Sequence, residues 1–386
     1  KCGAFDDILT MPNSLAYVGD GAFSNCAKLT GVILGRGIVR IGNEAFLGCT
    51  ALTSAILGEY DKESLSLGRS NLIEIGDYAF GACSSLNAID IPYTVVHIGM
   101  HAFRNSGIYD KASREVYAGN GVVDCKSDGV YGTVSIQNGT AGIADYAFYR
   151  CSGIGAVMIP DSVGIIGKSA FYKCKALSSV TLPAGLTEIK DYTFYYCSEL
   201  VLPKFPETLQ KIGRSAFYKC RLVSESNEGD SNLMEIPNSV IEIGDYAFYG
   251  CTYTYVDRDS TALTSVVIPK SLTTVGAHVF YGCRNLTIYT AYEDVPEGFH
   301  ERWNSSYRPL VLGALLSSDE SVSSFVWGAS SVRNLNDTNR LSGPIKDGYS
   351  FLGWSTAENG HAEYTEKTLS ALADGTRLYA IYRSNE

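Results

Sequence analysis

The stretch Ile243–Cys251, IGDYAFYGC, decides the fold of this chain because closely related stretches recur along most of its length. The other copies are IGNEAFLGC (41–49), IGDYAFGAC (75–83), IADYAFYRC (143–151), IGKSAFYKC (166–174), IKDYTFYYC (189–197), IGRSAFYKC (212–220) and VGAHVFYGC (275–283). Self-similarity at a period of about 20–50 residues is typical of stacked repeats. The sequence therefore predicts a solenoid.

The phenylalanine of each copy gives the length of one repeat. These residues are Phe23, Phe46, Phe80, Phe103, Phe148, Phe171, Phe194, Phe217, Phe248 and Phe280. Their successive spacings are 23, 34, 23, 45, 23, 23, 23, 31 and 32 residues, so the basic coil has 23 residues and the longer coils carry insertions. The spacing of 45 is close to two coils, and Val122–Cys125 keeps the F-x-x-C spacing there with Val in place of Phe.

Two short apolar patterns lie between the cysteine of one coil and the phenylalanine of the next. The first, L-x-x-L-x-L, alternates inward and outward residues as a strand requires, for example from Leu177 to Leu182. The second, as in Leu209-x-x-Ile212, predicts another short strand, and the D-Y-A-F segment after it predicts a turn. One coil cannot bury its apolar side alone, so stacking has to make the core continuous. We therefore expect a β-rich solenoid with its phenylalanines in the core.

The cysteines share one position of the repeat. All 11 fall there, and Ser106 fills the position in the remaining coil. One cysteine per coil, shortly after an aromatic residue, indicates a small hydrophobic side chain in a narrow turn. Parallel Cβ vectors along such a column make the dihedral angle of a disulfide hard to reach. We expect a buried ladder of free thiols, with a redox or metal role as the alternative.

Composition excludes some classes of protein. The chain has 386 residues, 45% of them hydrophobic, and a formal net charge of −10, which argues against general nucleic-acid binding because that needs a basic stripe. No apolar run is long enough for a membrane span. Lys1, not Met, stands first and falls inside a repeat, which indicates a fragment or a processed chain.

The full pattern, I-P-x-S-[VL]-x-x-I-G-x-x-A-F-x-x-C-x-x-L-x-x-V, resembles the BspA-like leucine-rich repeat over about residues 1–309. The resemblance implies a leucine-rich-repeat superhelix in a surface-exposed or secreted protein, usually bacterial. It also implies adhesion to host proteins, host cells or other bacteria. The segment Ile288–Trp303 departs from the repeat and adds aromatic residues, so we expect a C-terminal cap near 288–309.

From about Leu310 the character of the sequence changes. The F-x-x-C motif is absent, and a new motif runs from Gly348 to Trp354, followed by Gly375-Thr-Arg-Leu-Tyr-Ala. This combination is similar to the Listeria–Bacteroides repeat, over roughly Ser342–Arg383. The resemblance implies a small β-grasp-like module of bacterial surface proteins. We therefore expect two domains, the solenoid at 1–309 and a β-rich module at 310–386.

The sequence contains little that indicates catalytic or metal-binding residues. His97 and His101 are four residues apart but flank a repeat turn, so a metal site there is disfavoured. No G-x-S-x-G elbow, H-E-x-x-H motif or Walker loop is present. The Asp of D-Y-A-F repeats with the coil, as at Asp77 and Asp245, which favours a role in capping the N–H groups of the turn. We expect no enzyme activity, no cofactor and no metal.

A recurring tyrosine beside the core phenylalanine is the best binding candidate. The candidate residues are Tyr149, Tyr172, Tyr195, Tyr218, Tyr249 and Tyr281, with the cations Arg150, Lys173 and Lys219. Earlier coils have Ser24, Leu47, Gly81 and Arg104 at the tyrosine position. If the phenylalanines point inward, the tyrosines lie on a rim, where amphipathic rings beside cations suit protein or glycan recognition. The alternative is that they stack on one another and only seal the turn layer.

Two hypotheses for function follow. The first is a non-enzymatic bacterial cell-surface or secreted protein that binds a host or bacterial surface protein or glycan through an extended solenoid face. The alternative is a passive structural spacer that presents another domain of a longer surface protein. The sequence leaves the ligand, the binding face, the anchoring and the oligomeric state open.

Overall fold

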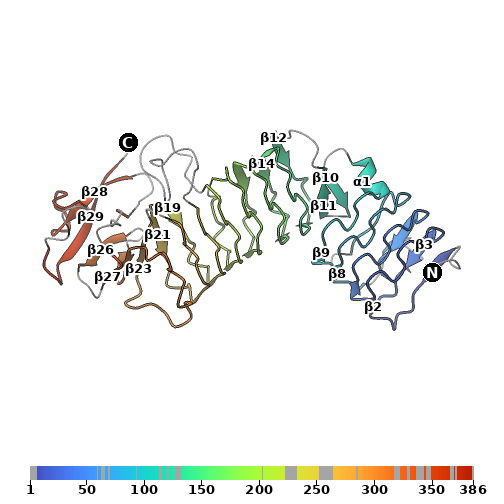
Figure 1. Ribbon diagram of the computed structural model, residues 1–386, viewed down its shortest axis with the longest axis horizontal. Coiled ribbons are helices and arrows are strands. Elements are labelled where there is room, and N and C mark those ends of the chain that lie inside the picture. Colours follow the sequence, from blue (N-terminus) through green and yellow to red (C-terminus); the bar gives the residue numbers. More distant parts are fainter. Residues whose placement is uncertain are drawn as a thin grey trace. The chain divides into compact units, whose positions relative to one another are not determined.

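The computed structural model describes residues 7–58, 60–61, 66–67, 70–92, 94–112, 115–119, 121–126, 132–201, 203–221, 233–251, 264–283, 286–316, 322–327, 331–335, 343–344, 349–365, 369 and 372–384 (Figure 1). The chain divides into two compact units. The N-terminal unit comprises Lys1–Ile154 and Met158–Cys174, and the C-terminal unit comprises Gly155–Val157 and Lys175–Glu386. Each unit is described by itself below.

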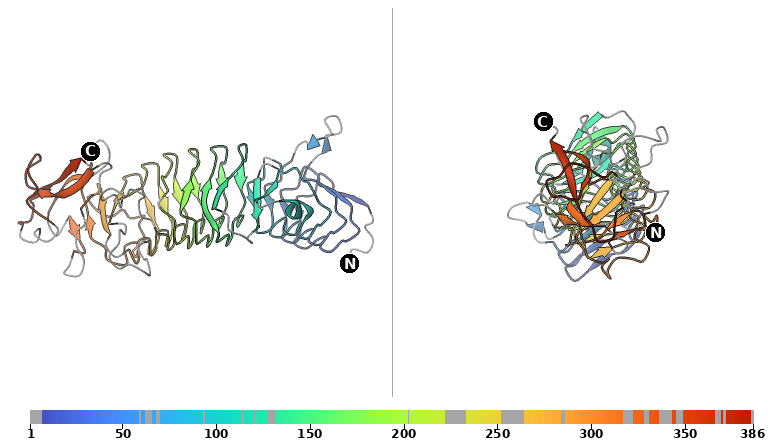
Figure 2. Two further views of the ribbon diagram at one scale, coloured as in Figure 1. Left: turned by 90° about the horizontal axis from the view of Figure 1, so that it is seen from above. Right: turned by 90° about the vertical axis from the view of Figure 1, so that its left-hand side faces the viewer.

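In the C-terminal unit, successive coils add strands to two sheets. One sheet holds β17 (Glu188–Ile189), β18 (Lys211–Ile212), β20 (Glu242–Ile243) and β22 (Thr274–Val275). The other holds β19 (Leu233–Glu235), β21 (Ser265–Ile268), β23 (Thr287–Thr290), β24 (Leu310–Val311) and β27 (Val332–Arg333). The strand β16 (Ser179–Thr181) comes before these strands in the chain and is not part of either sheet. Pairing is parallel between equivalent residues of neighbouring coils, such as Ile212 with Ile243, and Figure 2 shows these strands side by side. The predicted β-rich solenoid is confirmed.

The N-terminal unit repeats this arrangement. Its sheets are β1 (Ile8–Thr10), β3 (Gly31–Ile33) and β5 (Ser54–Ile56); β2 (Tyr17–Val18), β4 (Arg40–Ile41), β8 (Glu74–Ile75) and β9 (His97–Ile98); and β10 (Glu115–Ala118), β11 (Gly121–Cys125), β13 (Gly142–Ile143) and β15 (Ile165–Ile166). The 34-residue coil carries a hairpin of β6 (Tyr60–Asp61) and β7 (Ser66–Leu67). The remaining strands of the solenoid are β12 (Gly132–Ser135) and β14 (Ile154–Met158).

The degenerate coil predicted at Val122–Cys125 lies within β11. Val122 pairs with Ile143 of β13, so it takes the position of the isoleucine before the turn and not, as predicted, that of the phenylalanine. Only two residues separate Val122 from Cys125, whereas seven separate Ile143 from Cys151, so the D-Y-A-F turn is missing. The coil before it also departs from the pattern. Ser106, at the cysteine position, is the N-cap of α1 (Gly107–Lys111), and its hydroxyl accepts a hydrogen bond from the Tyr109 N–H (3.3 Å). An N-cap needs a side-chain oxygen, which explains why this coil has serine where the others have cysteine.

Stacked phenylalanines form the core, as the register predicts. Those from Phe46 to Phe280 in the repeat register are at most 1% exposed. In the C-terminal unit, Phe217 lies between Phe194 (ring centroids 5.3 Å apart) and Phe248 (5.5 Å), nearly parallel to both. Phe23, in the first coil, stacks on one described neighbour, Phe46 (5.4 Å), and is half-buried. Stacking at the coil spacing therefore gives the C-terminal unit a continuous aromatic core. In the N-terminal unit two such stacks, from Phe23 to Phe103 and from Phe148 to Phe171, lie on either side of the degenerate coil.

The cysteine ladder is a hydrogen-bonded one. The nine described cysteines from Cys49 to Cys283 are free and buried. Most of their thiols donate to the phenylalanine carbonyl of the preceding coil, as from Cys251 Sγ to the Phe217 oxygen (2.9 Å). A weak, compact donor in an apolar turn explains the preference for cysteine at this position. The expectation of free thiols is wrong for Cys26, which is disulfide-bonded, and Cys2 lies outside the described residues.

The solenoid sheet continues through the segment expected to be its cap. β23 lies inside that segment and pairs in parallel with both β21 and β24. The Ser306 hydroxyl donates to the Phe280 carbonyl (3.3 Å), the bond that a thiol makes in the preceding coils. β27 then pairs antiparallel with β24. Residues 286–311 thus form a further coil whose outer strand edge is covered by the C-terminal module.

The C-terminal module is built on an antiparallel sheet in the order β25 (Leu315–Leu316), β26 (Val322–Val326), β29 (Arg377–Ser384) and β28 (Tyr349–Ser355). Trp354 is fully buried against Phe325 and Phe351, with ring centroids 4.8 and 5.1 Å away. One hydrophobic cluster joins these rings to Tyr289 and Val311 of the solenoid. The module and the last coil therefore share a core.

Candidate functional site

The turn that precedes each cysteine exposes side chains in a regular way. Two residues of each complete coil have left-handed backbone angles, namely the second residue of D-Y-A-F and the residue before the cysteine. In the C-terminal unit the first set is Tyr192 (φ 58°), Ser215 (52°), Tyr246 (58°) and His278 (58°), and the second set is Tyr196 (59°), Lys219 (55°), Gly250 (65°) and Gly282 (83°). Left-handed angles cost non-glycine residues about 1 kcal/mol or more. The fold therefore tolerates a recurring cost at both positions.

The repeated aspartates do a different job from the one expected. The sequence predicts that they cap the N–H groups of their own turn. Instead, Asp191 Oδ1 accepts from the Arg214 N–H (2.7 Å) and Asp245 Oδ1 from the Ala277 N–H (2.8 Å), each one coil further along. Asp77 and Asp145 bond in the same way, to the N–H groups of Met100 and Lys168 (both 2.7 Å). The N–H groups of the turn are already bonded, as from Phe217 to the Ala247 carbonyl (2.9 Å), so the carboxylates join neighbouring coils.

Four of the predicted tyrosines form one stack in the C-terminal unit, here called the tyrosine column. Its ring centroids are 4.7 Å apart between Tyr195 and Tyr218, 4.6 Å between Tyr218 and Tyr249, and 5.1 Å between Tyr249 and Tyr281. The planes of neighbouring rings differ by 8–17°. The first three rings are half-buried and Tyr281 is 42% exposed. The column thus lies on the surface with its ring faces covered by neighbouring rings.

The predicted cations lie over tyrosine rings. Lys219 Nζ is 5.5 Å from the ring centroid of Tyr196 and 5.7 Å from that of Tyr218. Such cation–π contacts hold a positive charge at the rim. None of the ion pairs between described residues includes Lys219. Its charge is therefore available to a partner.

The remaining predicted residues lie in the N-terminal unit. Tyr149 and Tyr172 stack there with centroids 5.2 Å apart. Arg150 lies over the Tyr149 ring (5.2 Å) and Lys173 over the Tyr172 ring (5.3 Å). The predicted site residues thus lie in both units.

A second row of aromatic residues runs beside the column and was missed at the sequence level. It contains Tyr192, Tyr246 and His278. Their ring centroids lie 5.9–6.0 Å from those of Tyr195, Tyr249 and Tyr281 at inclined or edge-on angles. The signal was present in the second residue of D-Y-A-F, which is aromatic in these coils. The column and the second row together are called the aromatic ridge below.

Burial in the ridge keeps the phenol of Tyr218 neutral. The pKa of Tyr218 is raised to about 12, first because the ring is buried among its neighbours and then because phenolates at Tyr195 and Tyr249 would repel its own. Beside the ridge, Arg214 pairs with Asp245 (2.7 Å), which balances those two charges locally. At neutral pH Tyr218 therefore keeps its hydroxyl proton, and Lys219 places a cation beside its ring.

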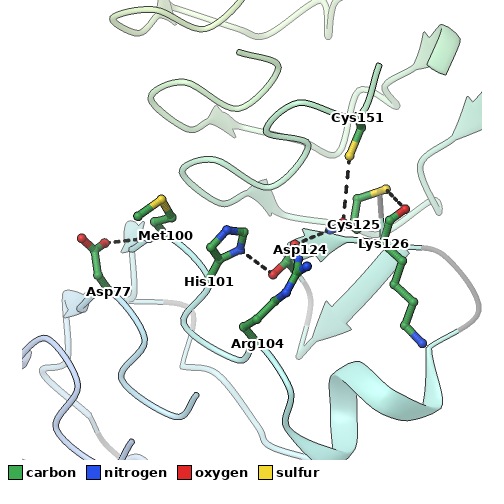
Figure 3. A network of polar contacts seen from close by, with 8 residues as sticks. All are labelled: Asp77, Met100, His101, Arg104, Asp124, Cys125, Lys126 and Cys151. Carbon is green, nitrogen blue, oxygen red and sulfur yellow. Dashed lines mark hydrogen bonds and ion pairs between the residues drawn. The ribbon is translucent and has the colours of Figure 1, made fainter. Parts of the chain in front are cut away.

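The two histidines considered for a metal site are paired separately with buried carboxylates. His97 Nδ1 lies 3.0 Å from Asp145 Oδ2, and His101 Nδ1 lies 2.9 Å from Asp124 Oδ2. Figure 3 shows Asp124, which is 2% exposed, held also by Arg104 (3.4 Å) and by the N–H of the next residue (2.8 Å). The contacts of Asp124 join the coil of Phe103 to the degenerate coil, where the usual turn is missing, and the His97–Asp145 contact joins the coil of Phe103 to that of Phe148.

Metal or membrane chemistry finds little support in the geometry. Among the described residues, no group of three or more His, Cys, Asp or Glu could hold a metal ion. The same residues include no helix with the length and hydrophobicity that a bilayer crossing requires. The ridge offers hydrogen-bond donors and aromatic edges, which are suited to binding.

Two family models match the chain. One, described as the BspA type Leucine rich repeat region, matches six copies at residues 62–113, 130–251 and 255–298, more than half of the chain. The other, the Listeria-Bacteroides repeat domain, matches residues 320–381, so it begins earlier than the expected Ser342. No curated protein matches.

Several solved structures are similar to the chain. A leucine-rich repeat protein from Bacteroides ovatus is 25% identical, with 73% of this chain and 63% of that chain covered and a TM-score of 0.37. A leucine rich cell surface protein from Faecalibacterium prausnitzii is 21% identical, with 78% and 90% covered and a TM-score of 0.34. A pneumococcal vaccine antigen is 18% identical, with 84% and 82% covered and a TM-score of 0.28. The chain thus spans less than two thirds of the Bacteroides ovatus protein.

Proposed function

The chain belongs to the BspA type leucine-rich repeat family, and from that premise we propose that it is a non-enzymatic surface or secreted protein that binds an extended partner along the aromatic ridge. The partner is a surface protein or glycan of a host or of another bacterium. A cell-surface site agrees with the description of the Faecalibacterium prausnitzii relative as a cell surface protein. Tyr149 and Tyr172 of the N-terminal unit, whose rings also stack, are a second candidate surface.

One observation carries the proposal: the tyrosine column is not needed to build a coil. The N-terminal unit has Ser24, Leu47 and Gly81 at the same repeat position, yet its turns form the same hydrogen bonds between coils. The Asn25 N–H donates to the Leu47 carbonyl (2.6 Å), as the Tyr196 N–H donates to the Tyr218 carbonyl (2.7 Å). A ring that architecture does not require, repeated on the surface, supports recognition.

The second candidate is a passive spacer. The stacking itself favours it, because rings that pack on one another also stabilise the turn layer. The exposure of Tyr281 and the unpaired charge of Lys219 favour binding instead, since a spacer needs neither. We therefore keep the spacer as the alternative that the experiment has to exclude.

The experiment compares binding and stability in the same variants. Tyr195→Ser combined with Tyr249→Ser installs the residue that the first coil carries naturally at Ser24. We expect binding to host cells, matrix proteins and a glycan array to fall at least about tenfold, since interface energy concentrates in a few aromatic residues. Tyr17→Ser is the control, because Tyr17 is 63% exposed and is not one of the residues of the ridge.

Melting temperature separates the two candidates. Loss of binding with a melting temperature within a few degrees of the native value supports the binding function. If the double variant binds as the native protein does, the ridge has only a structural role whatever the melting temperature, and the spacer function is favoured.

A further inference from the structure

The cysteine ladder is irregular at the degenerate coil. In six ordinary coils the thiol lies 2.9–3.3 Å from the phenylalanine carbonyl of a preceding coil, as Cys174 does from Phe148 (3.0 Å). Cys151 follows the degenerate coil, where that turn is missing, and its sulfur lies 3.9 Å from the Cys125 carbonyl. The Cys125 sulfur lies 3.7 Å from the Lys126 carbonyl. Both thiols therefore lack the short bond that fixes the thiols of ordinary coils.

The two thiols that lack this bond contact each other instead. The side chains of Cys125 and Cys151 are hydrogen-bonded to each other, and Figure 3 shows them next to one another at the end of β11. Cys125 is 2% exposed and Cys151 is 1% exposed, so the contact lies inside the N-terminal unit. Two sulfur atoms held in contact in this way are placed to form a bond.

The backbone at this pair differs from that of ordinary coils. There, neighbouring cysteines all follow a D-Y-A-F turn, and parallel Cβ vectors make the dihedral angle of a disulfide hard to reach. Cys151 follows such a turn, whereas Cys125 is the last residue of the strand β11, so the two backbones are not equivalent. The disulfide of Cys26 lies in another coil that departs from the average, the one with the half-buried Phe23. The cysteine position thus accepts a disulfide where a coil is irregular.

From this geometry we propose that Cys125 and Cys151 form a disulfide when the protein meets a small-molecule disulfide, so that the degenerate coil is a redox-sensitive latch of the N-terminal unit. The inference goes beyond the proposed function and does not depend on the aromatic ridge. Disulfides form and persist in the oxidising surroundings of surface and secreted proteins. The bond joins the degenerate coil covalently to the coil of Phe148.

The reaction consumes one small disulfide and releases two small thiols. The thiolate of one cysteine attacks a sulfur atom of the oxidant, which forms a mixed disulfide and releases one small thiolate. The thiolate of the other cysteine then attacks the protein sulfur of the mixed disulfide, which forms the Cys125–Cys151 bond and releases the second small thiolate. The protons of the two protein thiols pass through solvent to the two small thiolates. The protein pair is oxidised by two electrons, and the small disulfide is reduced by two.

Burial makes the first step slow. The pKa of the Cys125 thiol is raised by its hydrogen bond to Cys151 and by burial, so attack on the oxidant requires the coil to open. The N–H of Phe148 donates to the Ala170 carbonyl of the next coil (2.8 Å), whereas the N–H of Phe103 makes no such bond to a described carbonyl, because the next turn is missing. Segments with few such bonds open most readily. We therefore expect this pair to be oxidised over hours, while the thiols of ordinary coils stay reduced.

The test oxidises the whole chain and counts its thiols. The protein is incubated with an excess of oxidised glutathione, unfolded, alkylated and analysed by mass spectrometry. Of the nine described free thiols, seven should remain to be alkylated, and peptide mapping should show one cross-link, between Cys125 and Cys151. The melting temperature of the oxidised protein should be a few degrees higher, because the cross-link restricts the unfolded chain. Nine alkylated thiols, stable glutathione adducts at this pair, or cross-links spread over ordinary coils would overturn the inference.

Two serine variants locate the reaction. Cys125→Ser introduces the residue that the preceding coil has at Ser106, and its eight remaining described thiols should all stay reduced. Cys220→Ser removes a thiol that is bonded to the Phe194 carbonyl (3.0 Å), and its count should still fall by two, from eight to six. Equal losses in the two variants would show that the oxidation is not specific for the pair. If a variant does not fold, the peptide map of the native chain decides the question alone.

Discussion

Replacing Phe217 by alanine tests whether the phenylalanine stack carries the stability of the solenoid. The ring is fully buried, lies between Phe194 and Phe248, and meets Phe205 edge-on at 5.7 Å. Loss of a buried phenylalanine costs about 3–5 kcal/mol, less where neighbours collapse into the cavity. Collapse is hindered here because backbone bonds hold the flanking coils, as between the Phe217 N–H and the Ala247 carbonyl (2.9 Å). We expect about 4 kcal/mol.

The assay compares this fully buried position with a less buried one. Phe23→Ala removes a ring that is only half-buried, and should cost about half as much, roughly 2 kcal/mol. Because repeat arrays can lose coils separately, urea unfolding followed by circular dichroism should be joined to hydrogen exchange of the coils beside each site. A loss below about 1 kcal/mol at Phe217, or an equal loss at both sites, would refute the stacked-core reasoning.

Three further predictions concern thiols, alkaline pH and the buried carboxylate. Burial raises the pKa of several thiols, to about 12 for Cys83 and Cys283, and all nine described free cysteines are buried, so native protein should resist alkylation. Unfolding without reductant should expose these nine thiols but not Cys26, and rapid labelling of native protein would contradict this. The pKa of Tyr218 is about 12 in the folded protein and near 10 in the unfolded chain, so the free energy of unfolding should fall as pH rises through that interval. Tyr218→Phe should flatten the dependence of the urea midpoint on pH. An unchanged slope in this variant would argue against a role of Tyr218 in the pH dependence. Asp124→Ala leaves Arg104 and His101 without their carboxylate partner and should lower the free energy of unfolding by about 2–3 kcal/mol, measured by urea unfolding. The control is Asp110→Ala, at an exposed aspartate. An equal effect of both substitutions would show that the contacts of Asp124 do not contribute to stability.

The degenerate coil illustrates how a spacing argument succeeds and where it stops. The 45-residue interval predicts a further coil, and β11 pairs with β13 as a strand of that coil would. The predicted equivalence of Val122 to phenylalanine is wrong, because Val122 lies opposite Ile143. The contacts that replace the missing turn, from His97 to Asp145 and from His101 to Asp124, join residues 48 and 23 positions apart. No local pattern links such residues, because they meet only when coils stack.

The cysteines show the same limit. Their shared position in the repeat predicted burial, which is a property of one coil. The disulfide at Cys26 was not predicted, since the argument from parallel Cβ vectors assumed that every member of the column has the same geometry. The first coil, where Phe23 is also only half-buried, does not follow the average coil.

The sequence by itself determined the repeat, the two strands and turn of each coil, the buried phenylalanines and the tyrosine column, because each depends on residue chemistry that recurs every 23 residues. Only the tertiary structure decided that the aspartates bond to the next coil, that the C-terminal module shares the core of the last coil, and that Tyr192 and Tyr246 flank the column. Periodicity states which residues are equivalent, whereas the direction in which a left-handed turn points a side chain, and the neighbour it meets, are fixed by the stacking of whole coils.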